Sequence, residues 1–275
     1  MRRISRRQTS IPSQTHLGIV LALFAMLLGA ASTATAGPLA AFGDHTGEDH
    51  SFESSAHRNG SLESIILTNA NLEFSDFRNV NFTNAIFMNA LLRSTDLRNA
   101  NLTNAILTGA NLNDANLRSA ILVGADLTSA TLLGVEARDA NFTNATVVGA
   151  DLADANLRNA RFLGADLSNT SLLDIEARNA DFTDAVVNGV NFGTANLRNA
   201  RFTGASLLGA DLSNLSDQTN TNFDGAFFDS ATQFAPGFDT SALIFVPEPS
   251  SAVLMLLGLI GLASYPQGPH ARGSK

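Results

Sequence analysis

A five-residue repeat runs through the middle of this 275-residue chain and leaves few folds open to it. Every fifth residue from 67 to 212 gives thirty positions, of which eighteen are Leu and eight are Phe. Two positions earlier, from 65 to 210, twenty-two of the thirty residues are Ala. This period fits neither an α-helix nor an unbroken strand, which repeat every ~3.6 and ~2 residues.

Each pentapeptide has one inward pair, the large residue and the Ala two places before it. A pair separated by one outward residue is the spacing of a short extended segment. The positions between pairs carry turn-forming residues, as at Asn104, Gly109, Asp114 and Ser119. The sequence therefore predicts short extended segments with a turn after every five residues.

A second period, of twenty residues, appears at the outward positions. An unbroken ladder of arginine stands at Arg58, Arg78, Arg98, Arg118, Arg138, Arg158, Arg178 and Arg198. Phenylalanine forms a second ladder at Phe142, Phe162, Phe182 and Phe202, with Phe82 in the same column. Four turns per circuit would stack each ladder on one face of a coil, with members roughly 4.8 Å apart.

The pattern A-[D/N]-L-x-x, as in Ala125-Asp126-Leu127, resembles the pentapeptide-repeat family. The resemblance implies an all-β fold, a right-handed quadrilateral β-helix of about eight coils over residues 57–214. Where Ala137 and Ala177 replace the large residue, Val135 and Ile175 replace the small one, which restores the lost volume. Phenylalanines cluster after the repeat, and we expect residues 215–245 to form a C-terminal cap.

The first 36 residues have the parts of a secretory signal peptide. Four arginines precede a short apolar run, and Ala34 and Ala36 form a small-x-small cleavage site before Gly37. An uncleaved membrane anchor is the alternative, although the run is shorter than the roughly 20 residues of a span. Residues 37–56 are interpreted as a flexible linker.

The C-terminal residues 246–275 begin with the motif Val246-Pro247-Glu248-Pro249 and continue with an apolar run over 252–265. This tail resembles the PEP-CTERM sorting signal. The resemblance implies a short apolar transmembrane helix, transient inner-membrane anchoring, and processing by an exosortase-type enzyme. The family places clustered arginines after the apolar run, whereas this chain has Pro266-Gln267-Gly268-Pro269. A plain C-terminal anchor is the alternative.

Chemistry-bearing residues are sparse, and we expect no catalytic residues, no cofactor and no bound metal. Cysteine is absent, and no histidine follows His57 within the repeat. A possible metal cluster is interpreted instead as part of the spacer; its members are Asp44, His45, Glu48, Asp49 and His50. The net charge is −8, and loss of residues 1–36 would make the chain more acidic, which disfavours nucleic acid as a partner.

Carboxylates two residues before several arginines predict a self-neutralised ladder, at Asp76, Asp96, Glu136 and Glu176. A groove that binds polyanions is the alternative interpretation.

These features predict an exported, non-enzymatic structural or interaction protein at the cell surface or in the extracellular matrix. Signal peptidase and an exosortase are the partners expected during export, and an extracellular polysaccharide or another protein afterwards. One alternative is an acidic DNA mimic that binds a topoisomerase, which a signal peptide argues against. A second is a polysaccharide-binding or polysaccharide-acting solenoid.

Overall fold

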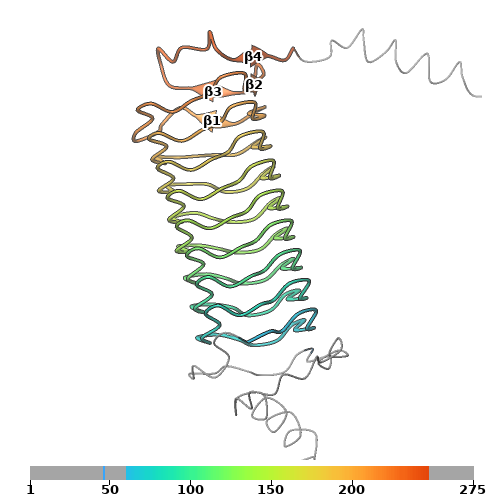
Figure 1. Ribbon diagram of the computed structural model, residues 1–275. Coiled ribbons are helices and arrows are strands. Elements are labelled where there is room, and N and C mark those ends of the chain that lie inside the picture. Colours follow the sequence, from blue (N-terminus) through green and yellow to red (C-terminus); the bar gives the residue numbers. More distant parts are fainter. Residues whose placement is uncertain (1–45, 47–59, 248–275) are drawn as a thin grey trace, which may run out of the picture.

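The described part of the chain winds into a stack of coils (Figure 1). The structure is a computed structural model, and it describes residue 46 and residues 60–247. Parallel bridges join residues twenty apart, from Ser61 and Asn81 to Asn191 and Asp211. Within these residues the chain forms turns, bridges and short strands and contains no helix. The predicted all-β solenoid is therefore confirmed for this part of the chain.

Four turns close each coil, and one of them shows how they are built. The backbone N–H of Ala105 donates to the carbonyl of Leu102 at 3.0 Å. Between them Asn104 has a φ of 56°, the left-handed conformation that a type II turn requires at its third position. The N–H of Asn104 donates to the carbonyl of Val123 on the next coil at 2.9 Å. Each turn thus also joins two coils.

The left-handed corner explains the residue types that occupy it. Asn, Asp, Ser and Gly tolerate this conformation better than other residues. At Gly164 a Cβ would lie 2.7 Å from Oδ1 of Asn144, so the amide of one coil covers the glycine of the next. Phe74 is the exception, with a φ of 60° and 59% of its surface exposed.

The interior holds both inward residues of each pentapeptide, as predicted. Ala160 and Phe162, for example, are completely buried. The paired exchanges at Val135 with Ala137 and at Ile175 with Ala177 are also buried. The narrow interior therefore stays closely packed where the large residue is missing.

The phenylalanine ladder forms a continuous stack of rings inside the rod. Ring centroids lie 4.7 Å apart between Phe142 and Phe162, 5.0 Å between Phe162 and Phe182, and 4.7 Å between Phe182 and Phe202. The stack continues to Phe223 at 5.1 Å. The predicted column is confirmed, although Phe82 makes edge contacts with other rings and lies outside this stack.

The coil period changes towards the C-terminal end. Asn196 bridges to Asp217, which is one residue longer than the regular circuit. Strand β1 (Asp211–Leu212) then pairs in parallel with β3 (Gln233–Phe234). Strand β2 (Phe227–Phe228) pairs in parallel with β4 (Ile244–Phe245). These irregular circuits lie on top of the regular stack (Figure 1).

Ring contacts hold the irregular circuits to the rod. Phe238 packs edge-on against Phe223, with centroids 5.3 Å apart, and stacks on Phe234 at 4.5 Å. The N–H of Val246 donates to the carbonyl of Phe228 at 2.7 Å. In residues 60–247 no helix is long and apolar enough to cross a membrane. The predicted apolar helix over 252–265 lies outside the described residues.

Candidate functional site: the arginine face

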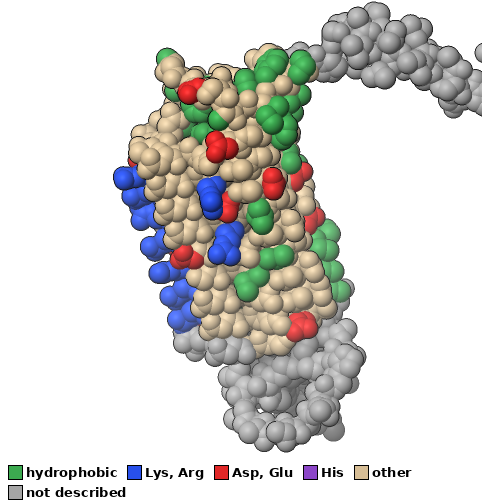
Figure 2. Space-filling model, turned by 45° about the horizontal axis from the view of Figure 1, so that its top comes forward, with side chains coloured by type: hydrophobic (Ala, Val, Ile, Leu, Met, Phe, Trp, Pro, Cys, Tyr) green, Lys and Arg blue, Asp and Glu red, His purple; other side chains and the backbone are tan. Residues whose placement is uncertain are grey.

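One side of the rod carries two parallel columns of polar residues, which we call the arginine face. The arginine column contains Arg78, Arg98, Arg118, Arg138, Arg158, Arg178 and Arg198. The partner column, two residues earlier on each coil, contains Asp76, Asp96, Asn116, Glu136, Asn156, Glu176 and Asn196. Bridges between consecutive members of the partner column confirm that they stack. Arginine side chains, in blue, follow one edge of the rod in Figure 2.

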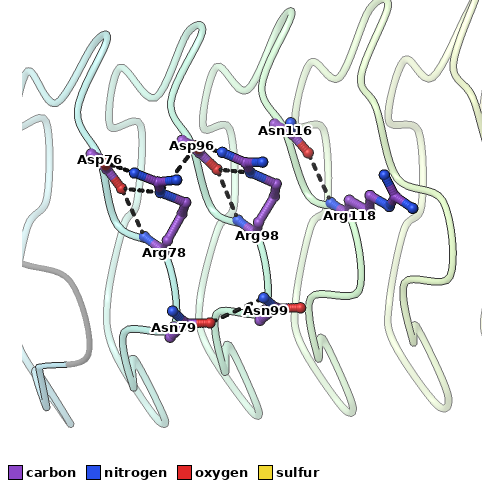
Figure 3. A network of polar contacts seen from close by, with 8 residues as sticks. All are labelled: Asp76, Arg78, Asn79, Asp96, Arg98, Asn99, Asn116 and Arg118. Carbon is purple, nitrogen blue, oxygen red and sulfur yellow. Dashed lines mark hydrogen bonds and ion pairs between the residues drawn. The ribbon is translucent and has the colours of Figure 1, made fainter. Parts of the chain in front are cut away.

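Local hydrogen bonds fix the backbone that presents these arginines. Oδ1 of Asn116 accepts the backbone N–H of Arg118 at 3.2 Å, and Oδ1 of Asp76 accepts that of Arg78 at 3.3 Å (Figure 3). Asp and Asn favour this contact because their short side chains reach the backbone two residues ahead. A charged Asp and a neutral Asn therefore make the same hydrogen bond to the backbone of the arginine.

The arginines that lie two residues after an Asp form bidentate ion pairs with it. Nε and Nη2 of Arg78 lie 2.9 and 2.7 Å from the two carboxylate oxygens of Asp76. The corresponding distances between Arg98 and Asp96 are 2.8 and 2.6 Å. The hydrogen bond to Asp96, and then its charge, raises the pKa of Arg98. The carboxylate in such a fork offsets the charge of its arginine, which weakens the attraction of that arginine for another anion.

Glutamates neutralise two further arginines and reach between coils. Arg138 pairs with Glu136, and Nε of Arg178 lies 2.7 Å from Oε1 of Glu176. Nη2 of Arg158 is 3.5 Å from Oε2 of the same Glu176, which belongs to the next coil. The prediction that the carboxylates stand beside the arginines is confirmed by these distances.

The arginines that lie two residues after an Asn are less compensated than the others. Among the described residues, Arg118 and Arg198 have no carboxylate oxygen within 4.0 Å. In Figure 3 the guanidinium of Arg118 points away from Asn116. Hydrogen bonds from Thr219 lower the pKa of Asp217, and the charges of Arg198 and Arg178 lower it further. Asp217, which bridges to Asn196, therefore interacts electrostatically with Arg198 although no ion pair within 4.0 Å joins them. The column thus combines closed ion pairs with arginines whose charge is less fully compensated.

A corner of the arginine face carries an amide ladder that the sequence analysis missed. Asn99 donates through Nδ2 to Oδ1 of Asn79 at 3.0 Å. Asn179 donates in the same way to Asn159 at 3.0 Å, and Asn199 to Asn179 at 3.1 Å. The signal was present in the sequence, because Asn recurs in this twenty-residue column at 79, 99, 159, 179 and 199, with Ser119 and Asp139 between the two groups. The turn prediction accounts for each Asn separately, whereas the bonds between coils depend on the geometry of two neighbouring corners.

The remaining predicted site residues lie mostly outside the described part of the chain. These are Ala34, Ala36, Gly37, Asp44, His45, Glu48, Asp49, His50, Arg58, Glu248 and Pro249. Val246 is held to the last circuit, and Pro247 follows it exposed. No metal-binding group of three or more His, Cys, Asp or Glu occurs in the described residues. A cleft of about 510 Å³ opens beside Gln218 and Phe238, at the irregular end of the rod.

A family model described as pentapeptide repeats matches the chain in eight copies, over residues 61–93, 95–134, 138–172 and 178–214. No curated protein matches the chain.

Several solved structures are similar to it. HetL, a pentapeptide repeat protein from the cyanobacterium Nostoc that is involved in heterocyst differentiation regulation, is 26% identical, with a TM-score of 0.28 over 64% of this chain and 87% of HetL. A pentapeptide repeat protein from the Arabidopsis thaliana thylakoid lumen is 32% identical, with a TM-score of 0.32 over 36% of this chain and 66% of that one. Full-length QnrB1, a plasmid-mediated fluoroquinolone resistance protein, is 18% identical, with a TM-score of 0.32 over 78% of this chain and 96% of QnrB1.

Proposed function

Because this chain belongs to the pentapeptide repeat family, we propose that it is an exported, non-enzymatic rod that offers its faces to a partner outside the cell. Proteins of this family are generally structural or interaction proteins. A rod of stacked coils holds side chains of one kind in register along a whole face. That geometry suits recognition of an extended partner, because each repeat contributes the same contact.

The observation that carries the proposal is the position of the sorting motif relative to the rod. Val246, the first residue of the motif, is hydrogen-bonded to Phe228 of the last circuits, and Pro247 follows it exposed. The motif therefore begins where the rod ends. An exosortase-type enzyme acting at Pro247-Glu248-Pro249 would release or transfer the rod without cutting into its coils.

The proposed route uses both ends of the chain. Signal peptidase removes residues 1–36 after Ala36, and residues 252–265 hold the chain in the inner membrane for a time. Processing of residues 246–275 then delivers the rod, with residues 215–245 as its cap, to the cell surface or extracellular matrix. Neither step requires a catalytic residue, cofactor or metal in this chain.

Mass spectrometry of the mature termini, combined with cell fractionation, tests this route. We expect a new N-terminus at Gly37 and loss of the C-terminal apolar run. Changing Pro247, Glu248 and Pro249 together to Ala should keep the chain in the membrane fraction with its tail intact. A matched triple change to Ala at Gln267, Gly268 and Pro269, beyond the apolar run, should leave sorting unchanged. A cytoplasmic chain with both ends intact would contradict the proposal.

An acidic DNA mimic that binds a topoisomerase remains the alternative with a clear test. The acidic net charge favours it. The arginine face argues against it, because seven stacked guanidinium groups interrupt a uniformly negative surface. We expect no inhibition in a DNA supercoiling assay with purified gyrase.

A further inference from the structure

We propose that the arginine face binds a linear acidic polysaccharide, one whose negative groups fall on alternate sugars. This inference rests on the proposed function, because export would bring the face into contact with such polymers. The site consists of three arginines, Arg118, Arg158 and Arg198, each two residues after an Asn of the partner column.

The first argument is the alternation of charge from coil to coil. From residue 116 to residue 196 the partner column reads Asn, Glu, Asn, Glu, Asn. Arg138 and Arg178 are closed by the glutamates of their own coils. Arg118 and Arg198 make no ion pair within 4.0 Å among the described residues, and Arg158 has a single contact, 3.5 Å from Glu176 on the next coil. The least compensated positive charge therefore recurs on every second coil.

The second argument is the spacing that results. Asn116 bridges to Glu136, which bridges to Asn156, so two available arginines are separated by two bridged steps. Two steps span roughly 9.6 Å. A sugar ring in an extended glycan advances the chain by about one such step. A polymer with a carboxylate on every second sugar can thus place one beside each available arginine.

The intervening glutamates provide selectivity against denser polyanions. A polymer with an anion on every sugar would place charges opposite Glu136 and Glu176. Nucleic acids fit less well still, because phosphates follow one another every ~3.4 Å along a DNA strand. Some of these closely spaced phosphates would lie beside Glu136 and Glu176, and repulsion between these like charges disfavours binding.

The third argument is the neighbouring amide ladder. Asn159, Asn179 and Asn199 stand one residue after arginines of the column and are bonded to each other across coils. Each amide has further hydrogen-bonding capacity, which sugar hydroxyl groups can use. Of the three arginines of the site, Arg118 and Arg198 are exposed and Arg158 is half-buried.

Binding of purified full-length protein to two polymers tests the inference directly. Hyaluronan carries a carboxylate on alternate sugars, and polygalacturonate carries one on every sugar. At low ionic strength, where charge attraction is least screened, we expect tighter binding to hyaluronan. Equal or tighter binding to polygalacturonate, or no binding to hyaluronan, would overturn the proposal.

Two matched triple variants locate the site. Arg118→Gln/Arg158→Gln/Arg198→Gln should weaken hyaluronan binding by at least about tenfold. Arg93→Gln/Arg161→Gln/Arg201→Gln removes the same charge from other columns and should change binding by less than about twofold. Equal losses in both variants would refute the proposed site and leave only general charge attraction.

A variant that gains binding shows that the charge pattern sets the preference, because a misfolded protein would lose binding instead. Glu136→Gln/Glu176→Gln frees Arg138 and Arg178, so positive charge becomes available on consecutive coils. We expect its preference to shift towards polygalacturonate, and an unchanged preference would overturn the spacing argument. Because binding is measured in vitro, an exported protein that does not bind refutes this inference alone. A binding protein that stays unprocessed in the cytoplasm refutes only the proposed function.

Discussion

Replacement of Phe162 gives the sharpest test of how the rod is held together. Its side chain is completely buried, and its ring stacks on Phe142 at 4.7 Å and on Phe182 at 5.0 Å. A Phe→Ala change in a core costs about 3–5 kcal/mol of unfolding free energy. Each ring pair adds about 0.5–1.5 kcal/mol beyond buried area. With stacking lost on both sides, we expect Phe162→Ala to cost about 4–5 kcal/mol, in the upper part of the core range.

Phe162→Leu is the informative companion, because Leu102 and Leu122 occupy the same interior column on earlier coils. Leucine therefore fits this position and retains most of the buried apolar area. The expected loss is the two ring contacts, about 1–3 kcal/mol. Urea unfolding followed by circular dichroism measures both variants against the unmodified protein. A Phe162→Leu midpoint equal to that of the unmodified protein would refute the contribution of the stack.

Four further predictions concern stability. Ala160→Glu places a charge in a fully buried position and should lower the unfolding free energy by several kcal/mol; a melting temperature that does not change would refute the inward assignment. Gly164→Ala should lower the unfolding free energy by about 1 kcal/mol or more, because φ is 64° and the new Cβ would lie 2.7 Å from the Asn144 side chain. The urea midpoint measures this loss, and adding Asn144→Gly should recover part of it. Phe74→Asn should stabilise by about 1 kcal/mol, because Asn tolerates the left-handed corner and the exposed ring is removed; a lower urea midpoint would contradict this reasoning. Burial alone would raise the pKa of Asp126, but hydrogen bonds from threonine outweigh burial and hold the pKa below its ordinary value of 3.8. This carboxylate therefore stabilises the fold above that pH, and its contribution is lost as the pH falls through the lowered pKa. Between pH 7 and pH 2, the melting temperature of Asp126→Asn should fall less than that of the unmodified protein.

Most of the fold could be predicted from the sequence, because in this solenoid distant contacts repeat at a fixed interval. Ala160 and Phe162 belong to a local pattern that already states which side chains face inward. The twenty-residue recurrence of Arg118, Arg138 and Arg158 states which of them stack. The twenty-residue spacing therefore predicts which residues of neighbouring coils lie in contact. In most globular folds, distant contacts do not recur at a fixed spacing and cannot be predicted in this way.

The candidate site was only partly predictable. The sequence indicated the arginine column and the carboxylates beside it. The reach of Arg158 to Glu176 on the next coil depends on side-chain directions, which a linear pattern does not contain. Bonds between asparagines such as Asn159 and Asn179 likewise need the corner geometry of two coils.

By itself, the sequence determined the inward and outward faces, the length of the circuit and the ladders of like residues. Those features follow from a local repeat whose inward positions must be small or apolar to fill a narrow interior. Only the tertiary structure decided the path after Leu212, where the regular circuit is lost, β3 pairs with β1 and β4 pairs with β2. There the period is lost, and ring packing around Phe223 and Phe238 fixes the chain instead of the repeat.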